Sequence, residues 1–186
     1  MGLLKRATHY SARSLASIRI GVALSRAAAT SQLRNIDLKD PNSWEFCGFS
    51  QNGEDGIIDV LMSRILRPNR YFIEIGSDTG IENNTAWLAI ARKYCGLMIE
   101  GNALSSRRSE ITLTPINPGV DHVCMFVSST DAAPLAEKSL YPDPDLFSLD
   151  IDGIDYHVAR AILAAGLRPK VAVVEYNSAF GPDRAL

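Results

Sequence analysis

The sequence predicts an α/β fold in which helices cover both faces of a mostly parallel sheet, forming a three-layer sandwich. Five short apolar runs are bounded like buried strands, and they alternate along the chain with segments whose apolar residues recur at helical spacing. Strands that alternate with helices favour parallel pairing through right-handed crossovers. The chain has 186 residues, of which 46% are hydrophobic, so it can bury the core of one domain.

The predicted elements follow one another in a regular order. The predicted strands are residues 71–75, 96–100, 123–127, 146–150 and 170–176. The predicted helices are residues 50–66, 84–95 and 154–166, an irregular helix within 101–122 and a short helix within 130–140. Glu54 and Asp55 lie near the positive end of the first helix, and Gly166 is the stop signal of the last.

The first 45 residues are predicted to be a basic, weakly ordered segment that precedes a domain at residues 46–186. Before Asp37 the chain holds six Lys or Arg residues and no acid. No stretch there is long and apolar enough to span a bilayer. A weakly ordered surface helix or tail is the favoured interpretation. A transit-like peptide and a basic amphipathic helix that rests on anionic lipid are the alternatives.

Charge and cysteine content restrict the partners and the compartment. A formal net charge of −2 gives no reason to expect nucleic acid as a partner. Cys47, Cys95 and Cys124 are odd in number and lack metal-ligand spacing, which favours buried thiols in a reducing compartment. We therefore expect a cytoplasmic protein that contacts a membrane, if at all, from its surface.

The segment "YFIEIGSDTGIENNT", residues 71–85, runs from an apolar strand into an acidic, glycine-containing loop. Gly76 and Gly80 would let the backbone turn tightly and approach a ligand, although glycines also simply turn a strand into a helix. Glu74 could accept a hydrogen bond from a ligand ammonium, and Asp78 adds a second carboxylate. Glu100 ends the next strand, where a carboxylate can accept both hydroxyls of a ribose. The loop therefore predicts a nucleoside-containing ligand.

The residues that this loop lacks narrow the choice of ligand. A dinucleotide fingerprint that starts at Gly76 needs glycines at the positions of Asp78 and Ile81, and a phosphate-binding Gly-Lys-Ser/Thr sequence is missing. An acidic loop is a poor cradle for pyrophosphate, but it suits a ligand with an amine and a sulfonium. The predicted cofactor is S-adenosylmethionine.

A second acidic group follows the fourth predicted strand. Asp150 and Asp152 would point to the same face if the strand continued that far, and Mg²⁺ or Ca²⁺ would suit them. We favour a substrate contact, with Asp152 capping the next helix and a turn at Gly153, over a metal. Glu175 and Asn177, at the end of the fifth strand, are candidates to hold an acceptor hydroxyl.

Five segments in this order carry a family resemblance, namely "FSQNGEDGII", "FIEIGSDTGIENNT", "GLMIEGN", "FSLDIDGIDY" and "RPKVAVVEYNSAFGP". Together they resemble the FkbM-related S-adenosylmethionine-dependent methyltransferases, in particular the subgroup with a Ser-Gln-x-Gly-Glu-Asp-Gly helix before the first strand. The match runs from about Phe49 to Pro182 and is loose between Glu100 and Leu146. The family fold continues by two strands after the fifth, so the chain is expected to be a fragment or a curtailed relative.

The resemblance implies a class I methyltransferase sheet, which is Rossmann-like, and a set of site residues. The predicted cofactor-binding residues are Glu74, Gly76, Ser77, Asp78, Gly80, Asn84, Glu100 and Gly101. The predicted substrate-binding residues are Gln51, Glu54, Asp155, Tyr156 and Asn177, and the predicted catalytic residues are Asp150, Asp152 and Glu175. No metal is predicted.

Three functions compete at this stage. The first is O-methylation of a sugar, a glycan or another small-molecule hydroxyl. The second is a non-catalytic methyltransferase-like domain, which the expected loss of the final strands favours. The third is a metal-dependent glycosyltransferase, because Asp-x-Asp at Asp150 and Asp152 also holds divalent ions in enzymes that use sugar nucleotides. An uncovered fifth strand also predicts self-association.

Overall fold

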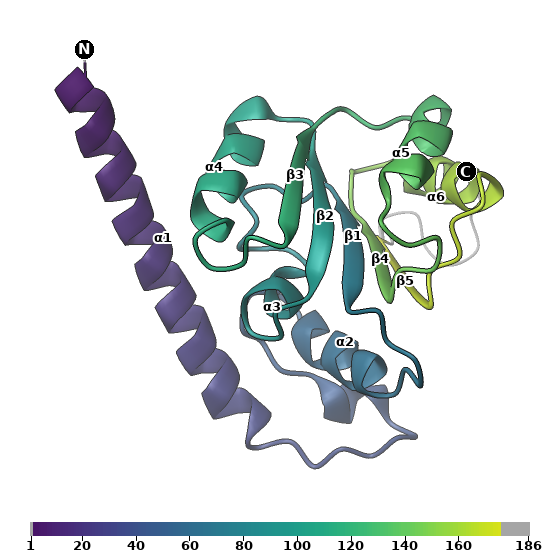
Figure 1. Cartoon of the computed structure of the whole chain (residues 1–186). Helices are drawn as coiled ribbons and strands as arrows, with labels where there is room; N and C mark the ends of the chain where they lie inside the picture. The colour runs from purple at the N-terminus through teal and green to yellow at the C-terminus, as the bar shows by residue number, and fades with distance from the viewer. Residues whose placement is uncertain (1, 176–186) are drawn as a thin grey trace.

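The chain folds around a five-stranded parallel sheet (Figure 1). The computed structural model describes residues 2–175, and the side chains of residues 15–175. The strands are β1 (Tyr71–Ile75), β2 (Cys95–Glu100), β3 (Val120–Cys124), β4 (Leu146–Leu149) and β5 (Val171–Val174). Their order is β3-β2-β1-β4-β5, so the direction of winding reverses between β1 and β4. The predicted α/β, Rossmann-like fold is confirmed, and ligands of such sheets bind at this reversal, beyond the carboxyl ends of the strands.

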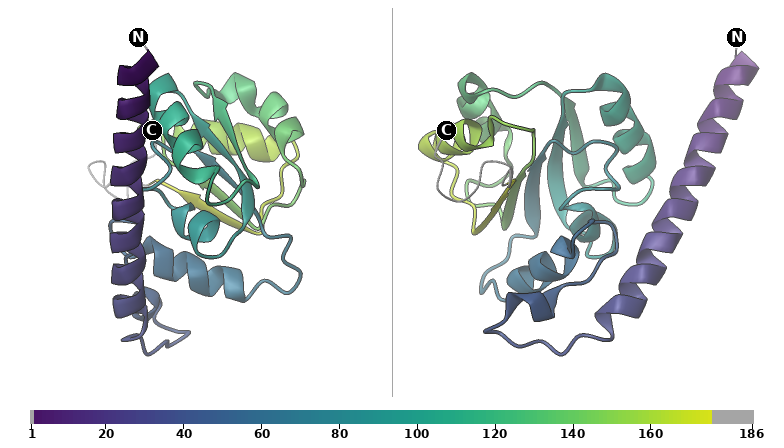
Figure 2. Two further views of the ribbon diagram at one scale, coloured as in Figure 1. Left: turned by 60° about the vertical axis from the view of Figure 1, so that its left-hand side comes forward. Right: turned by 180° about the vertical axis from the view of Figure 1, so that it is seen from behind.

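Helices cover both faces of the sheet (Figure 2). They are α1 (Gly2–Ser31), η1 (Pro41–Trp44), α2 (Glu54–Ser63), α3 (Ala86–Ile90), α4 (Ala103–Leu113), η2 (Ser129–Asp131), α5 (Ala132–Lys138) and α6 (Asp155–Ala164). One core cluster joins the sheet to α1, α2, α3 and α4, and a second joins the opposite face to α5 and α6.

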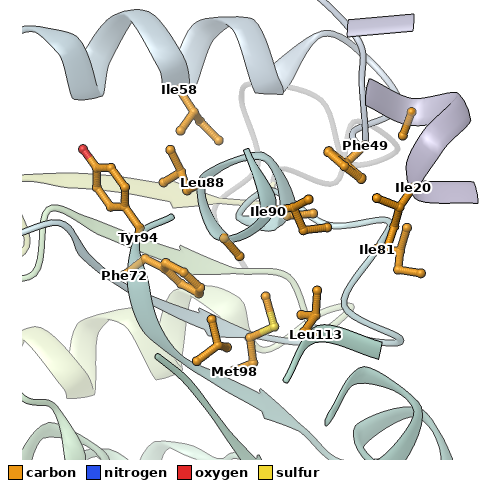
Figure 3. Packing of buried hydrophobic residues seen from close by; sticks show 14 of the residues in the cluster. Ile20, Phe49, Ile58, Phe72, Ile81, Leu88, Ile90, Tyr94, Met98 and Leu113 are labelled. Atoms are coloured by element: carbon orange, nitrogen blue, oxygen red, sulfur yellow. The ribbon is translucent and has the colours of Figure 1, made fainter. Parts of the chain in front are cut away.

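The central strand β1 shows how the sequence divides its side chains between these two layers. Tyr71, Ile73 and Ile75 belong to the cluster under α5 and α6, whereas Phe72 belongs to the other cluster, together with Met98 (Figure 3). All five residues of β1 are buried, as expected for a parallel strand that is covered on both faces.

Two predicted elements differ from the observed ones. The strand predicted at 123–127 is found at Val120–Cys124, where it pairs with β2 from Gly96 to Glu100. It is an edge strand with half-exposed polar residues, so its pattern is less apolar than the run that follows it. The helix predicted at 84–95 spans only Ala86–Ile90, because the chain turns at Lys93, whose φ is 56°.

The N-terminal segment is helical, and one side of α1 packs on the domain. Ala16, Ile20, Ala23 and Ala27 recur at helical spacing and are buried, and Figure 3 shows Ile20 beside Ile81. The division of the chain at residue 45 stays a prediction, although α1 and the sheet contribute to one core cluster. Within residues 2–175, none of the helices combines the length and apolar character that a membrane span requires.

The three cysteines are free thiols, but their burial differs from the expectation. Cys95 and Cys124 are exposed, and Cys47 is half-buried. The prediction of buried thiols was therefore wrong for Cys95 and Cys124. Both lie at strand ends beside or on the edge strand β3, where less of the surrounding structure covers them.

The position of β5 supports a prediction about assembly. Among the described strands β5 lies at one end of the sheet, and Val174 is 39% exposed. Because an edge strand with an apolar surface pairs readily with another chain, we expect concentration-dependent self-association in light scattering. Val174→Lys should lower the average mass, whereas Leu66→Lys, at an almost fully exposed position after α2, should not. A wild-type monomer at all concentrations would contradict this prediction.

Candidate active site

The loop after β1 turns sharply at the reversal of the sheet. Gly76, Asp78 and Gly80 have φ values of 85°, 43° and 77°. The backbone amides of Gly76 and Ser77 both donate to the carbonyl oxygen of Ile99, at 2.9 and 3.2 Å. The loop is therefore tied to the carboxyl end of β2 at its start.

The two glycines of this loop are required by the packing of the protein itself. A Cβ on Gly76 would lie 1.8 Å from the carbonyl oxygen of Asp150, and a Cβ on Gly80 would lie 2.3 Å from the hydroxyl of Ser109. Both positions also need the left-handed backbone that glycine adopts readily. Of the two interpretations of these glycines, the structure supports the one in which they turn and pack the chain.

Glu100, at the end of β2, organises the two loops around it. Its Oε2 accepts from the backbone amide of Asp78 at 2.8 Å, and its Oε1 accepts from that of Asn102 at 2.7 Å. The side chain of Asp78 accepts in turn from the Ser105 hydroxyl at 2.8 Å. A carboxylate has about four acceptor positions. Glu100 therefore retains the capacity to accept hydroxyl groups of a ligand.

A hollow of about 560 Å³ lies beyond the carboxyl ends of the central strands, and we call it the switch-point hollow. Its acidic edge includes Asp78, Glu100 and Asp150, and its apolar wall includes Met125, Phe126 and Ile151. Gly76 also lines this hollow. A hollow lined by both apolar side chains and carboxylates is suited to a ligand that combines a flat ring with hydroxyl or cationic groups.

A second hollow, of about 480 Å³, adjoins the first, and we call it the polar hollow. It is lined by polar side chains that include Gln51, Glu54, Asn84, Asp150 and Glu175. Gly76, Glu82 and Asp150 line both hollows. A molecule in the polar hollow would therefore lie next to one in the switch-point hollow.

Three carboxylates converge where the hollows meet. Asp150, Asp152 and Glu175 each offer an oxygen within 4.8 Å of the others. Parallel pairing explains part of this convergence, because Leu149 pairs with Val174, so the residues that follow them are neighbours. β4 ends at Leu149, so strand alternation does not align Asp150 with Asp152. A turn at Asp152 and Gly153, with φ values of 57° and 120°, brings Asp152 to the group.

Burial, together with the neighbouring carboxylates, raises the pKa of two of these acids. The pKa of Asp150 is raised mainly by burial, and the charges of Asp152 and Asp155 add to the effect. The pKa of Glu175 is also raised by burial and by the charges of Asp150 and Asp152. The interaction between the two carboxyl groups lowers the pKa of Asp150 and raises that of Glu175, which favours the proton on Glu175. Such a pair holds a proton at higher pH than isolated carboxyls do.

Glu74 was predicted to bind the cofactor, but it is buried in the core and lines neither hollow. Its position in β1 directs the side chain toward the layer of α2 and α3, where Glu74 is 1% exposed. Oε1 accepts from the Ser148 hydroxyl at 3.3 Å, and Asn84 donates to the same hydroxyl at 3.2 Å. Burial raises the pKa of Glu74 to about 8. Glu74 is therefore a protonated core residue at neutral pH.

The raised pKa of Glu74 predicts a change of stability with pH. Above a pKa of 4.5 the unfolded chain loses this proton, while the folded chain retains it up to about pH 8. Glu74 therefore lowers the free energy of unfolding progressively across this range, by on the order of a few kcal/mol. Glu74→Gln should stabilise the protein in urea unfolding, more at about pH 8 than at about pH 5. The exposed control Glu110→Gln should show no such trend. An effect of Glu74→Gln that is equal at both pH values would contradict the prediction.

Asp155 was predicted to contact the substrate and Asp152 to cap the next helix, but the structure gives each a different place. Asp155 accepts from the backbone amides of Ile151 and Gly153, both at 2.9 Å, and so holds the turn after β4. Asp152 does not cap α6, since the residue at the N-cap position is Ile154. Neither Asp155 nor Tyr156 lines the switch-point hollow or the polar hollow.

The remaining predicted residues divide between the two hollows, the interior and the undescribed end of the chain. Ser77 is 1% exposed and lines neither hollow. Gly101 lines the switch-point hollow, whereas Asn84 was predicted to bind the cofactor and lines the polar hollow. Gln51 and Glu54 line the polar hollow as predicted substrate contacts would. Asn177 lies outside the described residues.

The apolar wall of the switch-point hollow was not predicted. Phe126 is 84% exposed and lies so close to Gly101 that a Cβ there would be 2.6 Å from its ring. The run 123–127 was interpreted as one strand. In the structure β3 ends at Cys124, which pairs with Glu100, and Met125 then donates to the Glu100 carbonyl at 2.9 Å, so Phe126 follows the paired strands and lines the hollow.

Comparisons with known proteins leave the family open. No family model matches the sequence, and neither does any curated protein. The chain is similar to the solved structure of an O-methyltransferase from Bacillus cereus in complex with SAH, with 17% identity and a TM-score of 0.47. The similarity covers 82% of this chain and 61% of that chain, and it is too weak to support a conclusion about activity. The resemblance to FkbM-related proteins stays a prediction.

Proposed function

We propose that the chain is an S-adenosylmethionine-dependent methyltransferase that acts on a hydroxyl of a sugar, a glycan or another small molecule. The observation that carries the proposal is the pair of adjoining hollows at the reversal of the sheet, with Glu100 in one and the Asp150–Glu175 pair in the other. Two small molecules that exchange a group must lie side by side, and this arrangement provides two neighbouring sites.

The residues of the switch-point hollow fit the proposed cofactor by their chemistry. Glu100 keeps free acceptor positions for ribose hydroxyls, and Phe126 with Met125 offers an apolar surface for a base. Asp78 and Asp150 add negative charge to the same hollow, which suits an amine and a sulfonium. When bound, S-adenosylmethionine supplies an electrophilic methyl group. This fit favours it over a nucleotide with a pyrophosphate.

The polar hollow supplies the groups that an acceptor hydroxyl needs. Gln51 and Asn84 can orient hydroxyl groups by hydrogen bonds, and both line this hollow. The Asp150–Glu175 pair can take the proton of the acceptor hydroxyl when the pair is deprotonated. General base catalysis and alignment together are sufficient for a direct displacement, so no covalent intermediate on the protein is required.

The convergence of Asp150, Asp152 and Glu175 favours one second candidate, a metal-dependent glycosyltransferase. Carboxylate oxygens are the ligands that Mg²⁺ and Mn²⁺ accept. Calorimetric titration with S-adenosylhomocysteine, and separately with a sugar nucleotide and Mn²⁺, distinguishes the two functions. Heat with the sugar nucleotide alone would overturn the methyltransferase proposal. Binding of S-adenosylhomocysteine without methyl transfer to any hydroxyl in an acceptor panel would support the non-catalytic domain.

Metal removal provides a further prediction. Because Glu100 and the apolar wall suffice for the cofactor, we expect the affinity for S-adenosylhomocysteine to be the same in the presence of Mg²⁺ and of EDTA. The measurement is calorimetric titration of the same preparation under both conditions. A loss of affinity in EDTA would place a divalent ion in the site and would favour the Asp150, Asp152 and Glu175 group as its ligands.

A further inference from the structure

α1 carries an exposed apolar stripe that borders the hollow between this helix and the domain. Leu15, Ile18 and Val22 are spaced so that they share one side of the helix, and their exposed fractions are 62%, 61% and 62%. A different side of α1 holds the buried residues that pack on the domain. Figure 2 shows α1 along the flank of the molecule, with one side turned away from the other elements.

The charge of this helix restricts what can cover the stripe. α1 contains five Lys or Arg residues and no Asp or Glu. Arg19 and Arg26 lie beside the stripe, on the side toward the domain. Arg19 pairs with Glu82 and still has 49% of its side chain exposed. A helix with an apolar stripe and only cationic charges is complementary to an apolar layer with an anionic surface.

We propose that α1 seats the protein on an anionic lipid bilayer, with the stripe of Leu15, Ile18 and Val22 inserted at the level of the headgroups. Burial of the three side chains supplies the apolar contribution, and the cations of the helix contribute electrostatic attraction to acidic headgroups. The length of α1, 30 residues, lets the helix lie along the surface over many lipids.

This seating has a geometric consequence for the candidate site. A third hollow, of about 540 Å³, lies between α1 and the domain and is lined by Ile18 and Val22 of the stripe. It shares Ser50, Gln51 and Glu82 with the polar hollow. A bilayer in contact with the stripe would therefore lie next to the acceptor side of the candidate active site.

Vesicle co-sedimentation of the full chain tests the proposal. We expect binding to vesicles of phosphatidylcholine with phosphatidylglycerol, and little binding to vesicles of phosphatidylcholine alone. High salt should weaken the binding because it screens the attraction between the helix and the headgroups. Equal binding to both kinds of vesicle, or to neither, would overturn the proposal.

Paired substitutions locate the contact. Ile18→Ser with Val22→Ser should reduce partition into the anionic vesicles at least about tenfold, since two inserted side chains become polar. Leu66→Ser, which alters an exposed leucine after α2, is the matched control and should leave partition unchanged. Unchanged partition of the double variant would overturn the assignment of the stripe. Circular dichroism and the midpoint of urea unfolding confirm that each variant is folded.

Two further measurements separate this proposal from its alternatives. If light scattering shows a dimer that Ile18→Ser with Val22→Ser dissociates, and the wild type does not bind vesicles, a second copy of the chain covers the stripe and the proposal is wrong. Binding of S-adenosylhomocysteine should be the same in the double variant as in the wild type. Failure of the methyltransferase proposal would abolish that binding without affecting vesicle partition.

Discussion

Glu100→Ala is expected to weaken the binding of S-adenosylhomocysteine by about a hundredfold. In the proposed complex the Glu100 carboxylate accepts two ribose hydroxyls, and two charge-assisted hydrogen bonds contribute together ~3 kcal/mol. The same side chain holds the backbone amides of Asp78 and Asn102. The substitution therefore removes ligand contacts and also loosens both loops. Isothermal titration calorimetry measures the change in affinity.

The matched control for this variant is Glu110→Ala. Glu110 lies on α4, has an exposed carboxylate that pairs with Arg107, and lines neither of the two adjoining hollows. Its substitution should leave the affinity as it is in the wild type. The thermal midpoint of each variant without ligand reports any loss of stability. If Glu100→Ala bound S-adenosylhomocysteine as the wild type does, Glu100 would not belong to the cofactor site.

Asp150→Asn and Glu175→Gln are expected to lower methyl transfer by about 10²- to 10⁴-fold, the usual contribution of a general base. Glu175→Gln is the cleaner variant, because Glu175 lines the polar hollow, whereas Asp150 also lines the switch-point hollow. Affinity for S-adenosylhomocysteine should be retained in Glu175→Gln. Transfer of a labelled methyl group to a responsive hydroxyl acceptor is the measurement.

The pH dependence of methyl transfer adds a second test of this base. The pKa values of Asp150 and Glu175 are both raised, so the pair is protonated at a pH where isolated carboxyls are already charged. Because only the deprotonated form takes the hydroxyl proton, the rate should rise with pH through the raised pKa. Glu137→Gln, on α5 and outside both hollows, should keep the wild-type rate and profile. Full activity of Glu175→Gln with a flat profile would show that another group is the base.

The Gly-Glu-Asp-Gly sequence at residues 53–56 mainly has a structural role, which the sequence pattern by itself did not reveal. Asp55 is fully buried, and its Oδ2 accepts from the backbone amides of Gly48, Phe49 and Ser50 at 2.7 to 2.9 Å. A Cβ on Gly56 would lie 2.1 Å from the Trp44 carbonyl oxygen. Asp55 and Gly56 therefore hold the segment that precedes α2 against α2. Gln51, which lies just before the motif, lines the polar hollow.

The sequence alone determined the alternation of strands and helices, because burial on both faces of a sheet imposes continuous apolar runs on the strands. It also placed Glu100 and Asp150 at strand ends, which parallel pairing brings to one edge. The tertiary structure was needed to show that Glu74 is enclosed in the core, because Ser148, which donates to it, comes from β4, far away in the chain. Asp150, Asp152 and Glu175 meet because of the register of β4 with β5 and the turn at Asp152. The sequence could not show this, because the contact joins residues that are far apart in the chain.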